Sequence, residues 1–569
     1  MEFSLMYPQN ADREERQLTA EAVNDLSIDF LTDALTDSRY EREHLRRLML
    51  RVNDDAETIS YRCDVFEDFL RFPELRERMK ELVAGLADLR DIERFQKDQE
   101  GSALWALINR LREIDEYVNC ITMIKTTLES LDVRSQGMRE LRRIVTEIDR
   151  ESGFPELRAD IDETLDKVRR LRSITIGVNL DSMLRPEAAG IISLNDEKFT
   201  DSGLMRRFMS FADRQQSELH RGTDVSGIRR FHPANPSTSN LVIGSFQTNS
   251  VTHEAKFDVS SVTGSDTLSN AISKPVTAIM KRTVADIKST LKRYVNISGY
   301  ALISLMPEII FYIRWAELVD RIRATGMPMC KAEILPADDR NCSFQEIYNI
   351  KLAINNVNGD NINIITNDVD FDDERRIYIL TGPNRGGKTI FTQAVGLAMM
   401  LAQWGIYVPA ASAEISPCDN MFTHFPADEN DTVDLGRLGE ESKRLSEIFG
   451  VATPRSFMLL NESLATTSVA EGLFIAKDVV KAMRYLGVRC VFNTHMHELA
   501  RSLDELNNGV EGKSRVESLV TGVQRGERSF KVAIAPPQGV SYARDIAEKY
   551  GVTFDQIKTE LDGREGFLS

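Results

Sequence analysis

Residues 381–389 have the sequence TGPNRGGKT, which combines a glycine-rich stretch with a lysine and a hydroxyl group. The spacing Gly-x-x-x-x-Gly-Lys-Thr is the pattern of a loop that binds nucleotide phosphates. Glycines permit a tight turn in which successive backbone N–H groups point toward phosphate oxygens. We expect the lysine to contact the β- and γ-phosphates and the threonine hydroxyl to be a ligand of Mg²⁺. The predicted nucleotide-binding residues are Gly382, Pro383, Asn384, Arg385, Gly386, Gly387, Lys388 and Thr389.

The segments that flank this loop have the patterns that phosphate binding requires. Residues 375–380 (RRIYIL) predict a strand, and residues 388–403 (KTIFTQAVGLAMMLAQ) predict a helix. A helix that begins at the loop presents the positive end of its dipole to the same anion. An eight-residue pattern can match by chance, but the strand and the helix on either side favour a nucleotide site.

A carboxylate follows a second apolar run. Residues 457–460 (FMLL) predict a buried strand that ends at Asn461 and Glu462. In ATPases with such a loop, this strand end lies beside the phosphates, where a carboxylate can orient the attacking water. Glu462 is therefore the predicted catalytic base. The alternative is an ordinary surface carboxylate at the end of a strand.

A histidine follows a third apolar run. Residues 491–499 (VFNTHMHEL) predict another strand, which ends near Thr494 and His495. A histidine there can hydrogen-bond the γ-phosphate or the water and respond to which nucleotide is bound. The chain has 7 histidines, and two of them, His495 and His497, lie in this short stretch. Because either one alone is more often structural than catalytic, both interpretations of His495 stay open.

Several of these segments together resemble the MutS family of DNA mismatch-repair ATPases. The loop TGPNRGGKT is similar to the family's TGPNxGGKS, including its unusual Pro-Asn pair. The segment GIYVPAASAEISPCDNMFTHF is similar to the family's GxxVPA-x-SAxI, and ATPRSFMLLNE, ATTS and NTHMHEL follow in the family's order. The ending GVSYARDIAEKYGV resembles the family's Ser-Tyr-Gly element. Residues 29–52 and 63–77 resemble its helical core and lever region.

The resemblance implies an ATPase that uses ATP and Mg²⁺, binds DNA and forms a homodimer through its ATPase domain. Lys388 and Thr389 match the family's nucleotide and magnesium residues. Glu462 matches its catalytic glutamate, and His495 matches its switch histidine. Asn367 falls where the family carries an asparagine near the adenine.

The sequence also departs from the family's pattern. Asn461 stands where the family carries the aspartate of an Asp-Glu pair, so we expect it beside Thr389 at a more weakly held metal, with slow turnover. Residues 434–441 (DLGRLGEE) lack the serine of the family's Ser-Thr-Phe loop, although Arg437 could offer a charge instead. Residues 464–468 (LATTS) replace a glycine-rich loop. Activation by a partner subunit is therefore left open.

The start of the sequence carries a further expectation. It begins almost at the helical core, so we expect the mismatch-binding and connector domains, with their Phe-x-Glu wedge, to be absent. We also expect no nuclease module after the ATPase. What remains resembles relatives that encircle branched or recombining DNA.

The composition is that of a soluble globular protein, with 42% hydrophobic and 28% charged residues. Its 6 cysteines are scattered without CxxC pairs, which favours reduced thiols in a cytoplasmic protein. The N-terminus lacks the pattern of a signal peptide, and the apolar runs are too short for a membrane span. A net charge of −17 argues against sequence-independent DNA binding over the whole surface, but not against a local basic patch.

Patterning predicts an α+β multidomain protein in which a mostly helical core and lever region precedes an α/β P-loop (ABC-like) ATPase domain. Apolar stripes at helical spacing occupy residues 73–95 and 156–172, and residues 173–180 alternate like a strand. Helical periodicity returns over residues 277–323, with a bend or break expected near Pro307. The predicted segments are an N-terminal tail (1–20), helical core and lever (21–185), a clamp-like excursion (186–265), returning helices (266–340) and the ATPase domain (341–569).

Two functions from different classes remain open on the sequence. The first is a MutS-like ATPase that moves its levers on DNA, with branched or recombination-type DNA as the expected partner. A basic excess in residues 203–232 supports it, although a solvated surface has the same composition. The alternative is a nucleotide-gated scaffold for a protein or RNA assembly, with weak or no turnover, which the acidic balance favours.

Overall fold

The computed structural model describes most of the chain. Its described residues are 3–11, 13, 16–98, 103–150, 154–169, 173–180, 182–183, 186–195, 285, 300–383, 385–425, 436–464, 469–512, 514–524, 527–537 and 550–562. The predicted basic stretch 203–232 and the loop at 233–265 lie outside the described residues, as do Asn384 and residues 434–435 and 465–468.

Contacts divide the chain into two compact units. One unit is formed by the described parts of Glu77–Asp132 and Glu140–Met306. The other contains Phe3–Arg76, Val133–Arg139 and Pro307–Ser569. The first helices of the chain therefore belong to the same unit as the nucleotide-site sequence. The division into five segments by composition stays a prediction.

The first unit is mainly helical. Its helices are α5 (Pro73–Asp98), α6 (Ala103–Ser130), α7 (Gln136–Arg150), α8 (Phe154–Arg169) and the short α13 (Tyr300–Ile303). The first residues of α5 and of α7 belong to the other unit. The stripes predicted from spacing are buried as expected, for example Leu82 and Leu86 in α5 and Ile161 in α8. The predicted strand at 173–180 is β3 (Ser173–Leu180), which pairs antiparallel with β4 (Pro186–Asn195).

The second unit opens with a layer of short elements. These are β1 (Arg16–Gln17), α1 (Ala20–Asp25), α2 (Ile28–Leu35), α3 (Arg39–Met49), β2 (Arg51–Val52) and α4 (Ala56–Arg71), and they are joined later by α14 (Met306–Ala324). Residues 3–7, from the predicted tail, are held here: the half-buried Glu308 on α14 accepts bonds from Ser4 Oγ at 2.8 Å and Leu5 N at 2.6 Å. The predicted break near Pro307 is confirmed, because α13 ends at Ile303 and α14 begins at Met306.

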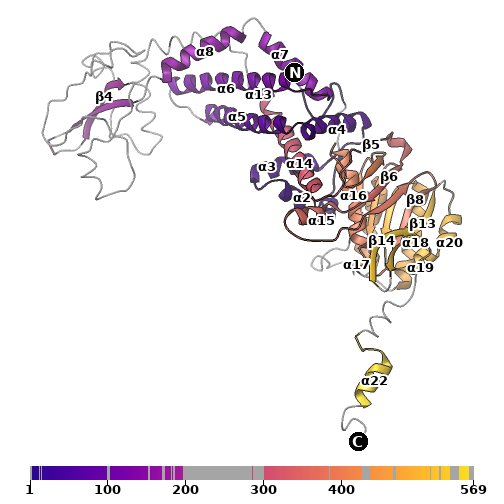
Figure 1. Ribbon diagram of the computed structural model, residues 1–569. Helices are drawn as coiled ribbons and strands as arrows, with labels where there is room; N and C mark the ends of the chain where they lie inside the picture. The colour runs from indigo at the N-terminus through magenta and orange to yellow at the C-terminus, as the bar shows by residue number, and fades with distance from the viewer. Residues whose placement is uncertain are drawn as a thin grey trace. The chain divides into compact units, whose positions relative to one another are not determined.

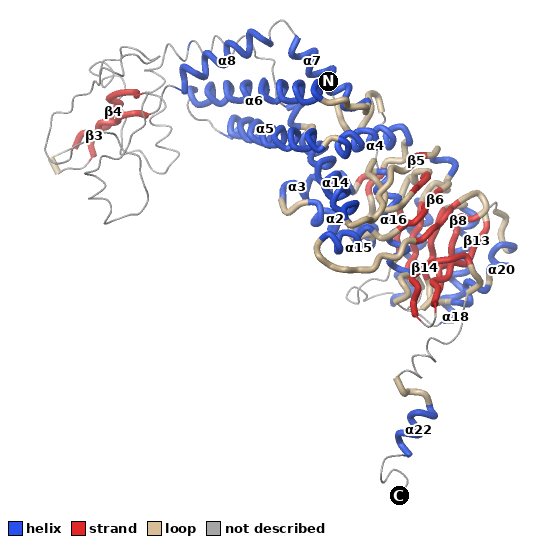
Figure 2. Tube along the Cα trace, in the orientation of Figure 1, coloured by secondary structure: helices blue, strands red, loops and turns tan. Residues whose placement is uncertain are grey.

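A six-stranded sheet forms the centre of the second unit (Figures 1 and 2). Its strands, in spatial order, are β10 (Met421–His424), β11 (Phe457–Asn461), β12 (Arg489–Asn493), β8 (Arg375–Thr381), β13 (Arg515–Gln524) and β14 (Glu527–Ile534). Every neighbouring pair is parallel except β13 and β14. The prediction of a mostly parallel sheet is confirmed, and apolar side chains on both faces account for it.

Helices cover both faces of this sheet. On one face, α17 (Gly436–Val451), α18 (Val469–Leu486), α19 (His497–Arg501) and α20 (Leu503–Asn508) share an apolar cluster with the strands, through residues such as Ile379, Leu460 and Phe492. On the other face lies α16 (Lys388–Gln403), whose Gly396 allows a close approach. A Cβ at Gly396 would lie 2.5 Å from Leu459 Cδ1 and 2.9 Å from Leu26 Cδ2. This helix is therefore packed between the sheet and the N-terminal layer.

A smaller sheet has the order β5 (Glu333–Ile334), β9 (Ser412–Ile415), β6 (Cys342–Ile347) and β7 (Asn367–Phe371). The 3₁₀ turn Ala337–Asp339, α15 (Ile350–Val357) and α22 (Phe554–Asp562) complete the described elements. The fold is a mixture of helices and sheets, as the α+β prediction states. Among the described helices, none has an apolar stretch long enough to cross a membrane.

Candidate nucleotide-binding site

The carboxyl ends of three parallel strands, β11, β12 and β8, lie at one edge of the large sheet. Asn461 at the end of β11 is opposite Asn493 at the end of β12, and Asn493 is opposite Leu380 near the end of β8. Because the strands are parallel, the segments that follow them all leave at this edge. The glycine-rich loop follows β8, Glu462 follows β11, and His495 comes two residues after β12. Residues more than 100 positions apart in sequence thus meet at one site.

The glycine-rich loop joins β8 to α16 and needs its glycines. Gly382 and Gly387 have φ angles of +144° and +87°, which L side chains rarely adopt. A Cβ at Gly382 would lie 2.0 Å from Thr521 Oγ1, and one at Gly386 would lie 2.8 Å from Pro383 O. The loop therefore lies directly against the backbone and side chain of β13. Arg385, also at positive φ, is exposed.

Lys388 is buried at the start of α16. Only 4% of it is exposed, and its Nζ donates to Gly382 O and Pro383 O, each at 3.1 Å. Burial lowers the pKa of Lys388, and the negative charge of Glu462 acts in the opposite direction. Two carbonyl oxygens are modest partners for a buried ammonium. The Lys388 ammonium would therefore gain from exchanging these neutral carbonyl oxygens for negatively charged ones.

Thr389, in the first turn of α16, faces the ends of β11 and β12. Its Oγ1 donates to Asn461 Oδ1 at 3.0 Å, and Asn493 Nδ2 lies 3.5 Å from the same hydroxyl. Asn493 Nδ2 also donates to Asn461 Oδ1. The proton of Thr389 is committed to Asn461 and one lone pair of its oxygen faces Asn493 Nδ2, so the second lone pair remains for a cation. Oxygen donors of this kind suit Mg²⁺, so the residues present fit the metal.

Glu462 and His495 form a pair at the mouth of the site. His495 Nε2 lies 2.7 Å from Glu462 Oε1, and each side chain is about one-third exposed. The hydrogen bond from His495 lowers the pKa of Glu462; burial opposes this, and the charges of His495 and Lys388 add to it. Glu462 is therefore a carboxylate at pH 7, partly open to solvent and held in a defined orientation.

The turn that carries Glu462 is fixed by several contacts that the sequence did not reveal. Glu462 has a φ of +54°, and its N donates to Asn493 O at 2.8 Å. Ser463 Oγ donates to His424 O at 3.0 Å and lies 2.7 Å from His424 Nδ1. Leu464 N donates to Glu441 Oε2 on α17 at 2.5 Å. Burial lowers the pKa of His424 to about 4, so this ring supports the turn as a neutral group.

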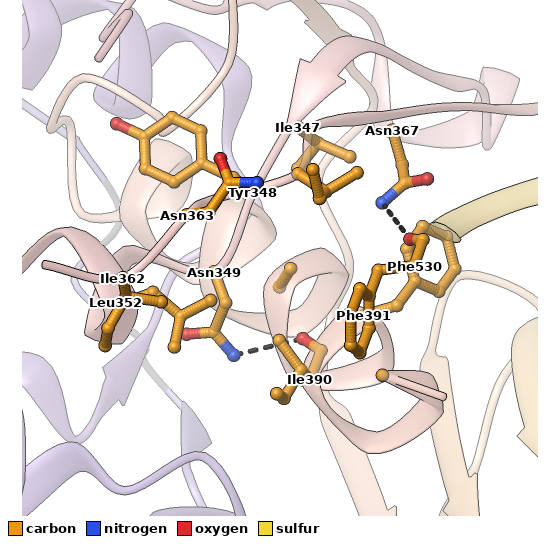
Figure 3. A pocket seen from close by; sticks show the side chains of 13 residues that line it. Ile347, Tyr348, Asn349, Leu352, Ile362, Asn363, Asn367, Ile390, Phe391 and Phe530 are labelled. Atoms are coloured by element: carbon orange, nitrogen blue, oxygen red, sulfur yellow. Dashed lines mark hydrogen bonds between the residues drawn. The ribbon is translucent and has the colours of Figure 1, made fainter. Parts of the chain in front are cut away.

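A cavity of about 240 Å³ opens next to the loop at Gly387 (Figure 3). Apolar side chains form much of its wall, among them Ile347, Phe391 and Phe530. Asn367 lies in the wall, but its amide is engaged by β14: Nδ2 donates to Phe530 O at 3.4 Å and Oδ1 accepts from Val532 N at 2.7 Å. The lining residues are Ile347, Tyr348, Asn349, Leu352, Ile362, Asn363, Ile365, Asn367, Gly387, Ile390, Phe391, Ala394 and Phe530.

The structure thus brings most of the predicted site residues together. Lys388, Thr389, Asn461, Glu462 and His495 meet at one sheet edge. Asn367 lines the adjoining cavity, and Asn384 lies outside the described residues. Sequence reasoning missed Asn493, although its place at a predicted strand end was a usable signal. No short-range pattern pointed to the parts played by His424, Glu441, Thr521 and Phe530.

Comparisons with known proteins agree with this architecture. Residues 378–544, which include the site, match the family model of MutS domain V. Residues 54–325 match the model of the MutS2 N-terminal domain. The two matches lie in the order in which the chain places its helical part and its ATPase-type part.

Curated relatives carry the same family name. The chain is 26% identical over 536 residues to the DNA mismatch repair protein MutS of Chlorobaculum tepidum, covering 88% of this chain and 56% of the relative. It is 34% identical over 196 residues to MutS of Chlorobium chlorochromatii, covering 34% of this chain and 22% of the relative. The chain is 31% identical over 205 residues to the DNA mismatch repair protein MutS 2 of Halobacterium salinarum, covering 35% of this chain and 23% of the relative.

The chain spans 56% of the length of the first of these relatives and less than a quarter of the other two. The two family models nevertheless cover both the helical part and the site. Together with the strand-end site and the order of the sequence motifs, they show that the chain belongs to the MutS family.

Proposed function

We propose that this protein binds ATP with Mg²⁺ at residues 382–389, hydrolyses it with Glu462 as the base, and uses the cycle to move its helical part on DNA. One observation carries this proposal. Lys388, Thr389, Asn461 and the Glu462–His495 pair converge at a single edge of a parallel sheet, from three different strand ends. That is the edge at which ligands bind in open α/β sheets.

Phosphate binding follows from groups already in place. In the proposed complex, Lys388 gives up its bonds to Gly382 O and Pro383 O and turns to phosphate oxygens. The first-turn amides of α16 face the same anion with the positive end of the helix dipole. When bound at Thr389, Mg²⁺ would neutralise charge on the phosphates.

The cavity beside Gly387 is the proposed site for the base. Its apolar wall suits the faces of an aromatic ring, and Phe530 and Phe391 stand on one side of it (Figure 3). The Asn367 amide makes one hydrogen bond to β14 through each of its polar atoms, which holds Phe530 in place and leaves one N–H group and one oxygen lone pair for the base. Asn363, which is exposed and also lines the cavity, is a second candidate for a direct polar contact with the base.

Hydrolysis is assigned to Glu462. Its carboxylate is ionised, half-buried and next to Lys388, so it can accept a proton from a water that attacks the γ-phosphate. His495 orients this carboxylate and stands where it can sense the γ-phosphate. The backbone bond from Glu462 N to Asn493 O ties the base to β12, next to the strand that leads into the loop.

The pH dependence of turnover tests the role of His495. Because the hydrogen bond from His495 lowers the pKa of Glu462, His495→Ala is expected to raise that pKa toward its usual range. As the solution is acidified, Glu462 in the variant would then become protonated at a higher pH than in the natural protein. The fall of kcat/KM on the acid side of the pH profile should therefore move to higher pH. Profiles from about pH 4 to pH 8 measure this shift, with His497→Ala as the matched control. An acid limb in the same place in both variants contradicts the assignment.

Contacts of α16 offer a route from the nucleotide to the rest of the unit. Gln393 Nε2 donates to Asp25 O at 2.7 Å, and Gln403 Nε2 donates to Asn53 O at 2.8 Å. Arg62 on α4 donates back to Gln403 O at 3.3 Å. A displacement of α16 on nucleotide binding would therefore be transmitted to α1 and α4. We propose that such movement drives the helical levers, in a homodimer formed through the ATPase domain.

DNA, and branched DNA in particular, is the proposed partner of the helical part. Fluorescence anisotropy with a four-way junction and a matched duplex, at about 50–200 mM salt, measures DNA binding. We expect the junction to bind more tightly than the duplex. We also expect its affinity to fall as salt rises, by about 0.9 log units per log unit of salt for each phosphate contact. Reversing Arg206, Arg207, Arg229 and Arg230, which lie outside the described residues, should weaken it. If neither DNA binds at the lowest salt, the nucleotide-gated scaffold, which the net charge of −17 favours, replaces this function.

A further inference from the structure

Asn461 and Asn493 form a buried amide pair behind the hydroxyl of Thr389. They are register partners at the ends of adjacent parallel strands, so their side chains project to the same face of the sheet. Asn461 is 6% exposed and Asn493 is fully buried. Asn461 Oδ1 accepts from both Thr389 Oγ1 and Asn493 Nδ2, while Asn493 Oδ1 is buried without a hydrogen-bond partner.

An amide at position 461 raises a problem that a carboxylate would not. A carboxylate presents two equivalent oxygens, so turning it over changes nothing. An amide presents an oxygen on one side and an NH₂ group on the other. Asn493 Nδ2 already approaches one lone pair of the Thr389 hydroxyl oxygen, at 3.5 Å. If Asn461 turned its NH₂ group toward Thr389, it would occupy the other lone pair and oppose a cation there. Only one orientation of Asn461 is therefore compatible with a metal at Thr389.

The bond from Asn493 selects that orientation. With Asn461 Oδ1 toward Thr389, Asn493 Nδ2 donates to the same oxygen. If Asn461 turned over alone, its NH₂ group would face the NH₂ group of Asn493, and a buried donor would lose its acceptor. If both amides turned over, the NH₂ group of Asn493 would enter the buried position where its Oδ1 now lies without a partner, so two buried N–H donors would lack an acceptor in place of one oxygen. Resting on the proposed function, we propose that Asn493 is a positioning residue: it fixes the oxygen of Asn461 on the Thr389 hydroxyl, so that a neutral amide can support Mg²⁺ binding in place of a carboxylate.

This role makes a prediction that depends on the residue at 461. The test measures the affinity for AMPPNP by calorimetry, with Mg²⁺ and with EDTA, and takes the ratio of the two as the gain from the metal. In the natural background, Asn493→Ala should reduce that gain by about tenfold, as is typical when a group that orients a metal ligand is lost. In an Asn461→Asp background, the same substitution should change it by less than about twofold, because the symmetric carboxylate needs no orientation.

Asn493→Leu, which keeps the forked shape but has no donor, guards against a general packing effect and should behave like Asn493→Ala. Melting temperatures of all variants identify any that fail to fold. An equal loss of metal gain in both backgrounds, or no loss in the natural one, overturns the positioning role alone. If the natural protein binds AMPPNP neither with Mg²⁺ nor with EDTA, the proposed function fails and this inference fails with it.

Discussion

Replacing Glu462 with glutamine is expected to lower kcat for ATP hydrolysis by about 10²–10⁴-fold, the range typical of losing a general base. The substitution keeps the shape of the side chain, and its amide oxygen can still accept the bond that His495 makes to Oε1 at 2.7 Å. The change therefore removes the proton acceptor with little disturbance of the site. Affinity for ATP should change by less than about threefold, since the base acts in the transition state rather than in binding.

Steady-state turnover with a phosphate-release assay measures this effect, with Glu498→Gln as the matched control. Glu498 is an exposed carboxylate on α19 that pairs with Arg501 at 3.4 Å. Its loss should leave kcat unchanged. If Glu462→Gln or Glu462→Ala turns over ATP as fast as the natural protein, the base is another group.

Replacing Lys388 with alanine should weaken Mg²⁺–nucleotide binding by about 10- to 100-fold, because a hydrogen bond to a charged group contributes about 1.5–3 kcal/mol. Lys388 is 4% exposed, so water cannot take its place easily at the phosphates. Turnover should fall as well, since charge on the leaving phosphates would be less well neutralised.

Calorimetry with AMPPNP measures the affinity, and Lys351→Ala is the control. Lys351 is a half-buried lysine of the same unit, but its Nζ donates to Ser27 Oγ and lies over the Phe30 ring. The control should bind nucleotide normally. Equal affinity for the natural protein and Lys388→Ala would contradict the phosphate role, and melting temperatures separate loss of binding from loss of folding.

Local patterns predicted the elements that carry the site. The apolar run before Gly382 became β8, the run before Asn461 became β11, and the helix after the loop became α16. These predictions succeeded because each depends on a few neighbouring residues: a short buried strand, a turn that requires glycine, and a helix of apolar residues. The buried stripe on α5 followed from its spacing in the same way.

Contacts between distant segments could not be predicted in this way. The pairing of Asn461 with Asn493 depends on the register of two strands separated by an 18-residue helix, α18. The hydrogen bonds between the Asn367 amide and β14 likewise join segments more than 160 residues apart. Residues 4–7, which fall in the predicted N-terminal tail, are buried, and Glu308, some 300 residues away, accepts bonds from Ser4 and Leu5. Such contacts are set by how whole elements pack, not by their own residues.

The most direct test of the account is calorimetric titration of the purified full chain with AMPPNP in the presence of Mg²⁺. We expect saturable binding at one site per chain, and a lower affinity when Mg²⁺ is replaced by EDTA. Absence of any binding with Mg²⁺ present would contradict the claim that Lys388, Thr389 and the loop amides hold a polyphosphate at this sheet edge.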